Sequence, residues 1–516
     1  MSARQHLPRP KAIGLAVAVA LVVVTLPGSA AAINGARADN PDVAVDAAGN
    51  AIAVWEYADG SDNRIQAAYR PAGADWGAPR YISAPGQETG YPRVVVAPTG
   101  DAIAVWERII DSGPRLQYNV QAAVRPAGGV WGPPEDLSPV GFHFGDPHIA
   151  LDAAGDAVAV WVRSDGPFEI VQASDRPAGG SWQPPQDLSR PTEYASGPQV
   201  AVDPAGDAVV TWQASASYHQ METAQASVRP AGGAWSPPED ISTVGALTPQ
   251  VSVDAAGNAI AVWLQGNRSL AAYRPAGGTW SAPEEIAATD GVFVASIAQD
   301  PAGNAMAAWM LIDGRGQRVQ AAVRPAGGPW GPPEDLSSTG VSFYPEISID
   351  AAGNATVLWL QYDGGDAVVK ARTRPAGGEW ESPADLSPVP GRSDLPKLAV
   401  GANGDAVAVW RLHAGSLALV QAARRRAGGA WGTPQELTEP FRVEPLPDCV
   451  VPRLLGKTLA RARVLIIRTE CLLGRVSRAY SRRVKRGRVL SQRPRPYKIV
   501  AAATRIDLVV SRGRRR

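Results

Sequence analysis

The sequence predicts a mainly β chain in which eight copies of a four-stranded antiparallel sheet precede a small α+β domain. Three observations predict this. The 16 tryptophans fall into two series of eight, with successive members 45 to 55 residues apart. Short turns rich in Gly and Pro separate runs of alternating apolar residues, which is typical of β-hairpins. The formal net charge is −18 over residues 33–438 and +16 over residues 439–516, which indicates two domains with different partners.

The tryptophans mark the repeats. The first series closes an apolar run in each repeat and consists of Trp55, Trp106, Trp161, Trp212, Trp263, Trp309, Trp359 and Trp410. The second series follows a Gly-rich turn and consists of Trp76, Trp131, Trp182, Trp235, Trp280, Trp330, Trp380 and Trp431. Self-similarity at a fixed period determines the architecture. We therefore assign residues 41–438 to one repeat array.

The N-terminal segment has the pattern of a secretory signal peptide. Basic residues precede an apolar run from Ala12 to Leu26, and small residues up to Ala32 offer a cleavage site. The apolar run is short for a membrane span, which needs about 20 residues. We predict a signal peptide over residues 1–32, with an uncleaved anchor as the alternative. No later segment has the length and apolarity of a span, so we expect an exported chain.

Each repeat contains four short strand signals. In the first repeat the predicted strands are Val43–Asp46, Ala51–Trp55, Gln66–Tyr69 and a short run that begins at Trp76. An Asp-x-x-Gly turn joins the first two strands and an Arg-Pro-Ala-Gly turn joins the last two. Four antiparallel strands in about 50 residues are typical of a β-propeller blade. An eight-bladed ring is the leading prediction. Seven blades with a displaced repeat, two smaller rings and a β-sandwich array are the alternatives.

The second turn resembles a known motif. Val228-Arg-Pro-Ala-Gly-Gly-Ala-Trp235 resembles the Asp-box of sialidase-like propellers, Ser-x-Asp-x-Gly-x-Thr-Trp, with Gly232 and Trp235 in matching positions. Pro or Arg occupies the Asp position throughout, so the resemblance implies blade topology and not catalysis. Sialidases use an arginine cluster, a Tyr–Glu pair and an Asp acid, and we find no counterpart in the sequence. A non-repeated cluster of carboxylates or arginines in the central channel would indicate an enzyme.

The recurring polar residues favour structural roles. An Arg precedes the second turn of each repeat, at Arg70, Arg125, Arg176, Arg229, Arg274, Arg324, Arg374 and Arg424. We expect these arginines to stack on a Trp or to cap the turn. The Asp of the first turn offers too few oxygen ligands for Ca²⁺ and is expected to cap its own turn. The histidines lack metal-ligand spacing. We predict no metal, no cofactor and no enzymatic activity.

The C-terminal segment predicts a βαβββ unit. Its helix runs from Thr458 to about Thr469, and its later strands are Leu472–Tyr480, Arg488–Arg493 and Arg505–Ser511. Residues 447–513 resemble a PASTA domain, and the matching motifs are Val451-Pro452-x-x-x-Gly456, Gly474-x-Val476, Gly487-x-Val489-x-Ser491-Gln492-x-Pro494 and Val509-Val510-Ser511-x-Gly513. The resemblance implies a bacterial source and a peptidoglycan partner. Residues 439–446 are the predicted linker.

Two further features of this domain suggest roles. Cys449 and Cys471 are expected to form a disulfide in an exported domain, with two free buried thiols as the alternative. Basic residues cluster at Arg478, Arg482, Arg483, Lys485, Arg486 and Arg488. We expect this patch to bind peptidoglycan or an anionic wall polymer. No nucleic-acid motif accompanies the patch.

We therefore predict a secreted, wall-associated binding or scaffold protein. Its repeat array is an interaction platform for an unknown protein or glycan, and its PASTA-like domain holds it at the cell wall. Connecting loops with aromatic residues, such as Phe142, Phe144, Tyr194 and Tyr344, are the places where binding is expected. The alternatives are a glycan-active enzyme and a lectin of sialidase-like propeller type.

Overall fold

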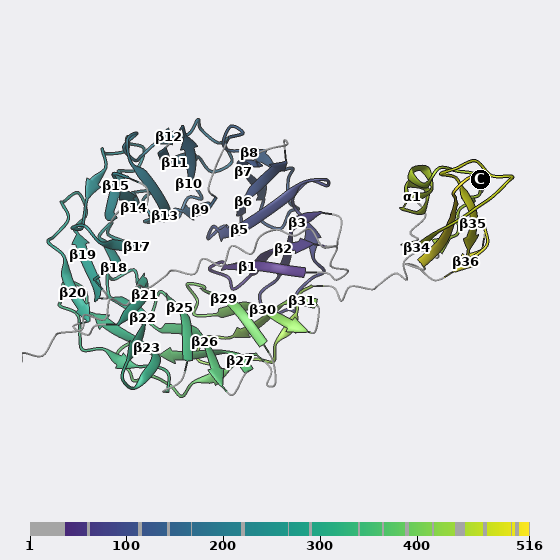
Figure 1. The fold of residues 1–516 in the computed structure, drawn as a ribbon. Coiled ribbons are helices and arrows are strands. Elements are labelled where there is room, and N and C mark those ends of the chain that lie inside the picture. Colours follow the sequence, from purple (N-terminus) through teal and green to yellow (C-terminus); the bar gives the residue numbers. More distant parts are fainter. Residues whose placement is uncertain are drawn as a thin grey trace, which may run out of the picture. The chain divides into compact units, whose positions relative to one another are not determined.

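The computed structural model describes residues 37–58, 62–111, 116–141, 145–166, 168–217, 222–266, 268–287, 291–338, 341–363, 366–387, 392–414, 417–438, 449–467, 472–496, 498–500 and 505–514. These residues are mainly in β-strands that form many small antiparallel sheets (Figure 1). Helix α1 (Leu459–Ile467) is the one α-helix in the described part of the chain. The prediction of a mainly β chain is confirmed.

Each of the eight repeats contributes four strands that pair antiparallel in sequence order, and we call this unit a sheet. Single parallel bridges join the seventh, eighth and first sheets, and likewise the third and fourth. The first strands are β1 (Arg37–Val45), β5 (Glu88–Val96), β9 (His148–Leu151), β13 (Tyr194–Val202), β17 (Ala246–Val253), β21 (Val292–Gln299), β25 (Val341–Ile349) and β29 (Arg392–Val400). The second strands are β2 (Ala51–Ala58), β6 (Ala102–Asp111), β10 (Ala157–Asp165), β14 (Ala208–Ser215), β18 (Ala259–Gln265), β22 (Ala305–Asp313), β26 (Ala355–Asp363) and β30 (Ala406–Ala414).

The outer half of each sheet consists of one long and one very short strand. The third strands are β3 (Asn63–Arg70), β7 (Leu116–Arg125), β11 (Phe168–Arg176), β15 (Thr223–Arg229), β19 (Arg268–Arg274), β23 (Gly316–Arg324), β27 (Asp366–Arg374) and β31 (Leu417–Arg425). The fourth strands are β4 (Arg80–Tyr81), β8 (Glu135–Asp136), β12 (Gln186–Asp187), β16 (Glu239–Asp240), β20 (Glu284–Ala287), β24 (Glu334–Asp335), β28 (Ala384–Asp385) and β32 (Gln435–Glu436). The fourth strand begins after Trp76, which lies in the preceding turn, so the predicted start of this strand is wrong by a few residues.

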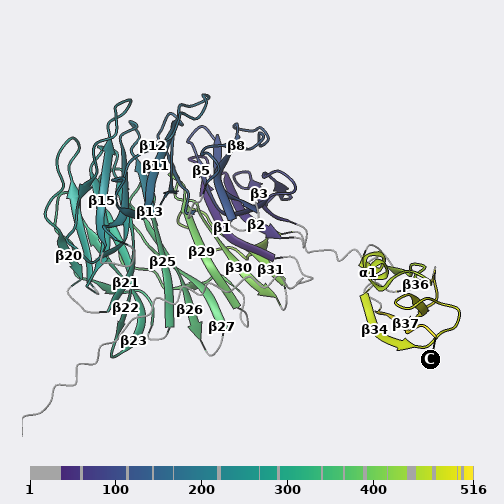
Figure 2. The same cartoon turned by 45° about the horizontal axis from the view of Figure 1, so that its top comes forward.

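The eight sheets follow one another around a single ring, with the first strands innermost (Figure 1). Figure 2 shows the same ring obliquely, with the strands of neighbouring sheets running alongside one another. The eighth sheet packs against the first, because β31 and β1 share a parallel bridge between Ala418 and Arg37 and because their apolar side chains form one cluster. All eight repeats therefore belong to one ring, unlike the alternative predictions of seven blades with a displaced repeat and of two smaller rings.

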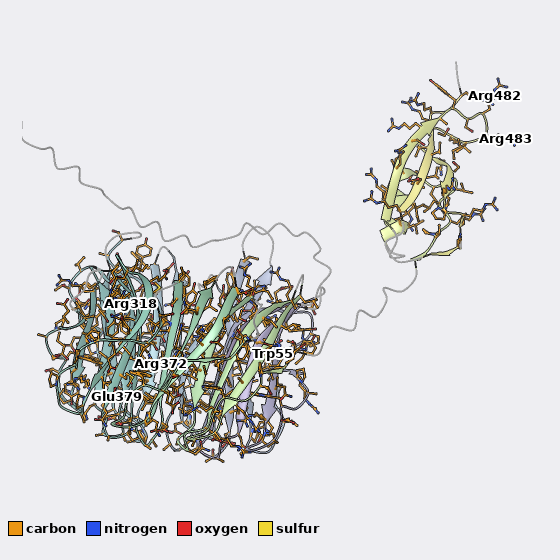
Figure 3. The ribbon with its side chains drawn as sticks, turned by 90° about the horizontal axis from the view of Figure 1, so that it is seen from below. Trp55, Arg318, Arg372, Glu379, Arg482 and Arg483 are labelled. Atoms are coloured by element: carbon orange, nitrogen blue, oxygen red, sulfur yellow. The ribbon has the colours of Figure 1, made fainter. Side chains whose placement is uncertain are left out.

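The apolar core lies between the sheets and not within any one of them. Eight clusters of buried side chains fill the eight seams, and each contains one Trp of the first series. In the closing seam, Trp55 packs with Val407, Val409 and Val420 of the eighth sheet, and Figure 3 shows where Trp55 lies. All eight of these tryptophans are fully buried. A single sheet therefore has no core of its own, as in other repeat proteins.

Each buried indole has a hydrogen-bond partner, as a buried polar group requires. Trp55 Nε1 donates to Gln66 Oε1 at 3.1 Å, and a Gln of the third strand plays this part in six repeats. The third strands of the fifth and seventh repeats carry Leu270 and Lys370 in that position, and the indole donates to Gln265 and to Gln361 instead. The sequence thus compensates for the lost partner within the same repeat.

The Asp of the first turn caps that turn, as predicted. Asp254 is buried and accepts hydrogen bonds from the backbone N–H groups of Ala256 and Asn258 and from the Asn258 side chain, at 2.8–2.9 Å. Ala97 occupies the equivalent place in the second repeat, where the backbone bonds of the turn still form. We expect Asp254→Ala to lower the free energy of unfolding by only about 1–2 kcal/mol. Urea unfolding measures this, and a loss above about 4 kcal/mol would contradict it.

The Arg of the second turn also has the structural role predicted for it. Arg70 donates to the carbonyl of Gly49 at 3.1 Å and lies 5.9 Å from the Trp76 ring, and Arg229 makes the equivalent contacts with Gly206 and Trp235. One assignment was wrong. In the eighth repeat the strand register pairs Ala406 with Arg425, just as Ala51 pairs with Arg70, so Arg425 and not Arg424 occupies this position. Because residues 424–426 are all arginines, the sequence alone did not show which of them occupies this position.

The C-terminal unit, residues 449–514, contains the predicted helix and later strands. Helix α1 is followed by β34 (Leu472–Ala479), β35 (Val489–Arg493) and β37 (Arg505–Ser511), which form a sheet in the order β34-β37-β35. A second pair, β33 (Cys449–Val450) with β36 (Ile499–Val500), completes the unit. Its small core includes Leu454, Ile466 and Leu508.

Three predictions fall outside the described residues. These are the signal peptide over residues 1–32, the linker over residues 439–446 and, because Cys471 is not described, the disulfide between Cys449 and Cys471. Among the described residues, no helix has the length and apolarity needed to cross a membrane.

Candidate active site

The first strand of nearly every repeat is interrupted by a bulge next to a proline. In β1 the pairing with β2 shifts between Asp39 and Asp42, and similar shifts occur in six other first strands. The residue before the proline has a positive φ at Asn40, Tyr91, Asp146, Gly197, Thr248, Tyr344 and Leu395. Bulges re-aim side chains and are common beside functional sites. Here they turn one side chain per repeat at the inner edge of the ring.

The residue at the position after the bulge, or at the equivalent position in the third repeat, is polar, and its charge varies between repeats. In chain order these residues are Asp42, Arg93, His148, Gln199, Gln250, Ser296, Glu346 and Lys397. They lie close enough to interact across the seams. Lys397 forms an ion pair with Glu346, and Asp42 accepts a hydrogen bond from the Val94 backbone N–H at 2.9 Å. The ionisable members come from the seventh, eighth, first, second and third repeats, so this inner ring is asymmetric.

Burial among these charges perturbs two members of the inner ring. It raises the pKa of Asp42 above its usual value, against the opposing effect of Arg93 and Lys397. Burial, together with Arg93 and Lys397, lowers the pKa of His148 to about 3. His148 is therefore uncharged at neutral pH. It lies near the next sheet, with its Nδ1 3.5 Å from the Val200 backbone nitrogen.

A second non-repeated position follows the buried Trp of the second strand, where the first repeat carries Glu56. The Glu56 side chain is 8% exposed and reaches the bulge of the next repeat. Its carboxylate accepts hydrogen bonds from the Tyr91 backbone N–H at 2.7 Å, from Asn40 Nδ2 at 2.6 Å and from Asn63 Nδ2 at 3.0 Å. Burial raises the pKa of Glu56, although these donors partly oppose the rise.

Glu107 occupies the same position in the second repeat, and its pKa is strongly raised. Its side chain is 4% exposed. Burial raises its pKa to about 7, the backbone N–H of Gly145 opposes this rise, and the charges of Asp146 and Glu56 add to it. A Cβ atom at residue 145 would lie 2.7 Å from Glu107 Oε2, so a side chain there would displace the Glu107 carboxylate. Near neutral pH the Glu107 carboxyl is thus partly protonated.

Tyr91 lies among these carboxylates. Its side chain is 46% exposed, and its pKa is raised by burial and then by the charges of Glu56, Glu107 and Asp146. Asp146 is the exposed residue before the proline in the third repeat, with φ at 54°. We call Glu56, Tyr91, Glu107 and Asp146 the Glu–Tyr cluster. It combines a partly protonated carboxyl, further carboxylates and an exposed phenol at one place on the inner edge.

An ion-pair network at the closing seam adjoins this cluster. Arg411 stands where the first repeat has Glu56, and its guanidinium contacts Asp39 of the first repeat at 2.6 Å and Asp394 at 2.6 Å. His413 Nε2 lies 2.9 Å from Asp394. Burial raises the pKa of Asp394, but the hydrogen bonds from Arg411 and His413 bring it below the usual value. This network fixes Asp39, which precedes the Asn40 partner of Glu56.

The same side of the ring is apolar over the fifth, sixth and seventh repeats. Exposed large side chains there are Val244, Leu247, Ile312, Val341, Tyr344 and Tyr362. They lie at the starts of first strands and the ends of second strands, as the Glu–Tyr cluster does. Phe343 packs edge-on against Tyr362, with ring centres 5.6 Å apart. This side of the ring thus presents the Glu–Tyr cluster over the first three repeats and exposed apolar side chains over the fifth to seventh, two of them tyrosines of the seventh repeat.

Of the loop aromatics singled out in the sequence, Tyr344 is 56% exposed, whereas Tyr194 is half-buried against Phe168. Phe142 and Phe144 lie outside the described residues. The eight tryptophans of the second series are half-buried and none is fully exposed. In the C-terminal unit all six residues of the predicted basic patch are exposed. Arg478 and Arg486 line one pocket, whereas Arg482 and Arg483 do not. Figure 3 shows where Arg482 and Arg483 lie.

The sequence reasoning missed the Glu–Tyr cluster because it searched for what the repeats share. The informative signal was the position after the buried Trp, where repeats carry Glu56, Glu107, Val162, Gln213, Leu264, Met310, Leu360 and Arg411. Four repeats carry an apolar residue at this position, so the fold does not require a carboxylate there. The two glutamates in adjacent repeats are therefore unusual. The conclusion that no non-repeated carboxylate cluster exists in the ring is wrong.

No known protein family and no curated protein matches the chain. Among solved structures, an ulvan-degrading polysaccharide lyase is 12% identical over 75% of this chain and 96% of its own, with a TM-score of 0.42. A protein of unknown function from Dyadobacter fermentans is 14% identical over 66% of this chain and 94% of its own, with a TM-score of 0.39. The NanB sialidase from Streptococcus pneumoniae is 11% identical over 65% of this chain and 67% of its own, with a TM-score of 0.35. These similarities assign no family to the chain.

The prediction that the chain is not an enzyme is wrong, because the reasoning behind it fails. It required a ring without a non-repeated cluster of carboxylates, and the Glu–Tyr cluster removes that ground. Two of the similar solved structures are themselves enzymes, a polysaccharide lyase and a sialidase.

Proposed function

We propose that this chain is an exported, glycan-active enzyme built on an eight-bladed β-propeller, with the Glu–Tyr cluster as its active site. The observation that carries the proposal is that Glu56, Tyr91, Glu107 and Asp146 meet at one place although the repeats share no such residues. A repeated residue is explained by the scaffold. A cluster formed once in eight sheets needs another explanation, and catalysis is the one that its chemistry fits.

The proposed reaction is cleavage of a glycosidic bond. Glu107, with its pKa near 7, donates a proton to the oxygen of the leaving sugar as the bond to the anomeric carbon breaks. Asp146 is the carboxylate exposed beside it, and it can take a proton from the attacking water, whose hydroxyl joins the anomeric carbon. The ring of Tyr91 offers a face on which a sugar can stack, and its hydroxyl can hydrogen-bond to the sugar.

Two exposed tyrosines of the seventh repeat support a polymeric substrate. Tyr344 and Tyr362 are exposed on the same side of the ring as Tyr91, and such side chains bind the apolar faces of sugars by stacking. A polysaccharide that contacts Tyr91 and also these two tyrosines is bound both at the cleavage point and at a distance from it. Binding energy from remote sugars then serves to position the scissile bond.

We further propose that the C-terminal unit is a PASTA-like module that holds the protein at the bacterial cell wall. Its strand and helix order supports this, because α1 is followed by β34, β35 and β37 as the resemblance implies, and the later motifs lie in or next to these strands. The basic surface supports an anionic wall partner. Attachment there would place the ring next to wall glycans, which are abundant polymeric substrates.

The test is glycan cleavage by the full chain. The protein is incubated with purified peptidoglycan and a panel of acidic and neutral polysaccharides, and new reducing ends are measured. We expect Glu107→Gln to lower the rate by at least about 100-fold while binding persists. The matched control is Glu239→Gln, which makes the same change at an exposed position on β16. It should leave the rate unaltered.

Each remaining outcome is informative. Binding that depends on Tyr91 without any cleavage would favour the lectin alternative and reject catalysis. Neither binding nor cleavage of any glycan would reject the proposal. A rate that Glu107→Gln leaves unaltered would place the active site elsewhere.

A further inference from the structure

The C-terminal unit contains a basic pocket that the sequence pattern did not define. It has a volume of about 570 Å³ and is lined by Leu459, Arg478, Tyr480, Arg486, Gly487, Val510, Ser511 and Arg512. Three of these residues are arginines with exposed side chains, and a fourth, Tyr480, is 53% exposed. Only two of the six residues of the predicted patch, Arg478 and Arg486, belong to it. Arg512 was not included in that patch.

Strand pairing explains why these arginines meet. In the parallel pair of β34 and β37, Arg478 lies opposite Val510, and the backbone N–H of Arg512 donates to the carbonyl of Ala479 at 2.8 Å. The backbone N–H of Gly487 donates to the Ser511 carbonyl at 2.9 Å and brings Arg486 to the same rim. Residues distant in sequence thus place three guanidinium groups around one space, on rigid backbone.

Among the described residues, no carboxylate lines this pocket. In the described part of the unit the only acidic residue is Asp507, whose Oδ1 accepts a hydrogen bond from the Arg475 backbone N–H. Within the described residues, no ion pair involves Arg478, Arg486 or Arg512. Arg512 lies 5.7 Å from the Tyr480 ring, an arrangement that orients the guanidinium without cancelling its charge. Three like charges held together without a counter-charge favour an anionic ligand.

We propose that this pocket binds phosphate groups of an extracellular phosphodiester polymer. A guanidinium donates paired hydrogen bonds to phosphate oxygens, and three of them can surround one tetrahedral group or span two neighbouring groups of a chain. The open rim, where all three arginines are exposed, lets a polymer enter and leave. The proposal deepens the attachment to the wall proposed above and rests on it for the place where the polymer is met.

A nucleic acid is the less favoured occupant of the pocket. Proteins that bind single-stranded nucleic acid combine a basic groove with several aromatic side chains on which successive bases stack. This pocket has a single aromatic residue, Tyr480, which already faces Arg512. The signal peptide predicted over residues 1–32 also directs the chain away from intracellular nucleic acid.

The test compares two triple variants of the full chain that remove equal charge. The pocket variant is Arg478→Ala/Arg486→Ala/Arg512→Ala. The control is Arg482→Ala/Arg483→Ala/Lys485→Ala, at exposed positions of the same unit that do not line the pocket. Binding of soluble poly(glycerol phosphate) is measured by calorimetry at two salt concentrations. We expect the pocket variant to bind at least about tenfold more weakly and with a smaller salt dependence, and the control to change affinity by less than about threefold.

Three other probes separate the alternatives. A variant with Lys in place of the three pocket arginines keeps the charge and should still lose affinity, because Lys cannot donate in pairs. Equal losses in the pocket and control variants would overturn the proposal, since they would show diffuse attraction. Tighter pocket-dependent binding of oligothymidine would overturn it in favour of a nucleic acid. Pocket-dependent binding of peptidoglycan freed of phosphate polymers would keep the attachment and reject phosphate as its chemistry. None of these results depends on cleavage at the Glu–Tyr cluster.

Discussion

Trp55→Ala should lower the free energy of unfolding by about 3–5 kcal/mol, the usual effect of removing a fully buried aromatic side chain. Trp55 fills the seam between the first and eighth sheets, together with Val407, Val409 and Val420. Its removal leaves a cavity there and also leaves the Gln66 side chain without its indole partner. Denaturant unfolding followed by tryptophan fluorescence measures the change. We expect the midpoint to fall and the fluorescence of the remaining tryptophans to be retained before unfolding.

The control is Trp76→Ala, in the same repeat and beside the same seam. Trp76 is half-buried and packs at the edge of the cluster that contains Trp55. Its loss should cost clearly less, about 1–2 kcal/mol, because less apolar surface leaves the core. Equal losses in the two variants would show that the seam is not held by its buried tryptophan.

Glu107→Gln should stabilise the protein above pH 7 and leave it unaltered below pH 4.5. Burial raises the pKa of Glu107 to about 7 in the folded chain, against 4.5 for an ordinary Glu. The folded state therefore binds this proton more tightly, and the protein loses stability as the pH rises between these two values. The shift corresponds to a loss of about 3 kcal/mol, complete above pH 7. A Gln cannot ionise, so the variant should not show this loss.

The natural fourth repeat indicates that this variant will fold. Gln213 stands at the position of Glu107, and its Oε1 accepts a hydrogen bond from the Thr248 backbone N–H at 2.9 Å. Thermal unfolding at pH 4, 6 and 8 gives the comparison, with Glu239→Gln on exposed β16 as the control that should follow the unmodified protein. Parallel pH curves for the unmodified protein and for Glu107→Gln would mean that Glu107 is ionised normally.

The fold could be predicted from the sequence because its elements are repeated. Eight copies of each turn and each Trp average out local ambiguity, and the pattern predicted four strands per repeat. The helix in the C-terminal unit was also expected, and α1 lies within its predicted range. The start of the fourth strand was missed because the two-residue strand β4 has no periodicity of its own. Closure of the ring depends on contacts between residues almost 400 positions apart, which no local pattern encodes.

The candidate site could not be predicted for the opposite reason. Glu56, Tyr91, Glu107 and Asp146 come from three repeats, and only the bulges and seams of the folded ring bring them together. In the sequence, Tyr91 differs from other residues that precede a proline in no informative way. Its positive φ and its carboxylate neighbours are properties of the folded ring. The pocket of the C-terminal unit was missed similarly, since Arg512 reaches Arg478 through strand pairing and not through sequence proximity.

The position of the core between sheets has a consequence for the order in which the chain becomes protected. As the chain is synthesised, each new sheet covers the exposed face of the one before it, but one face of the first sheet has no neighbour. That face, with Trp55 at its centre, stays uncovered until β29, β30 and β31 have formed. The earliest part of the array is thus the last to be shielded from water, and from other unfinished chains with the same uncovered face.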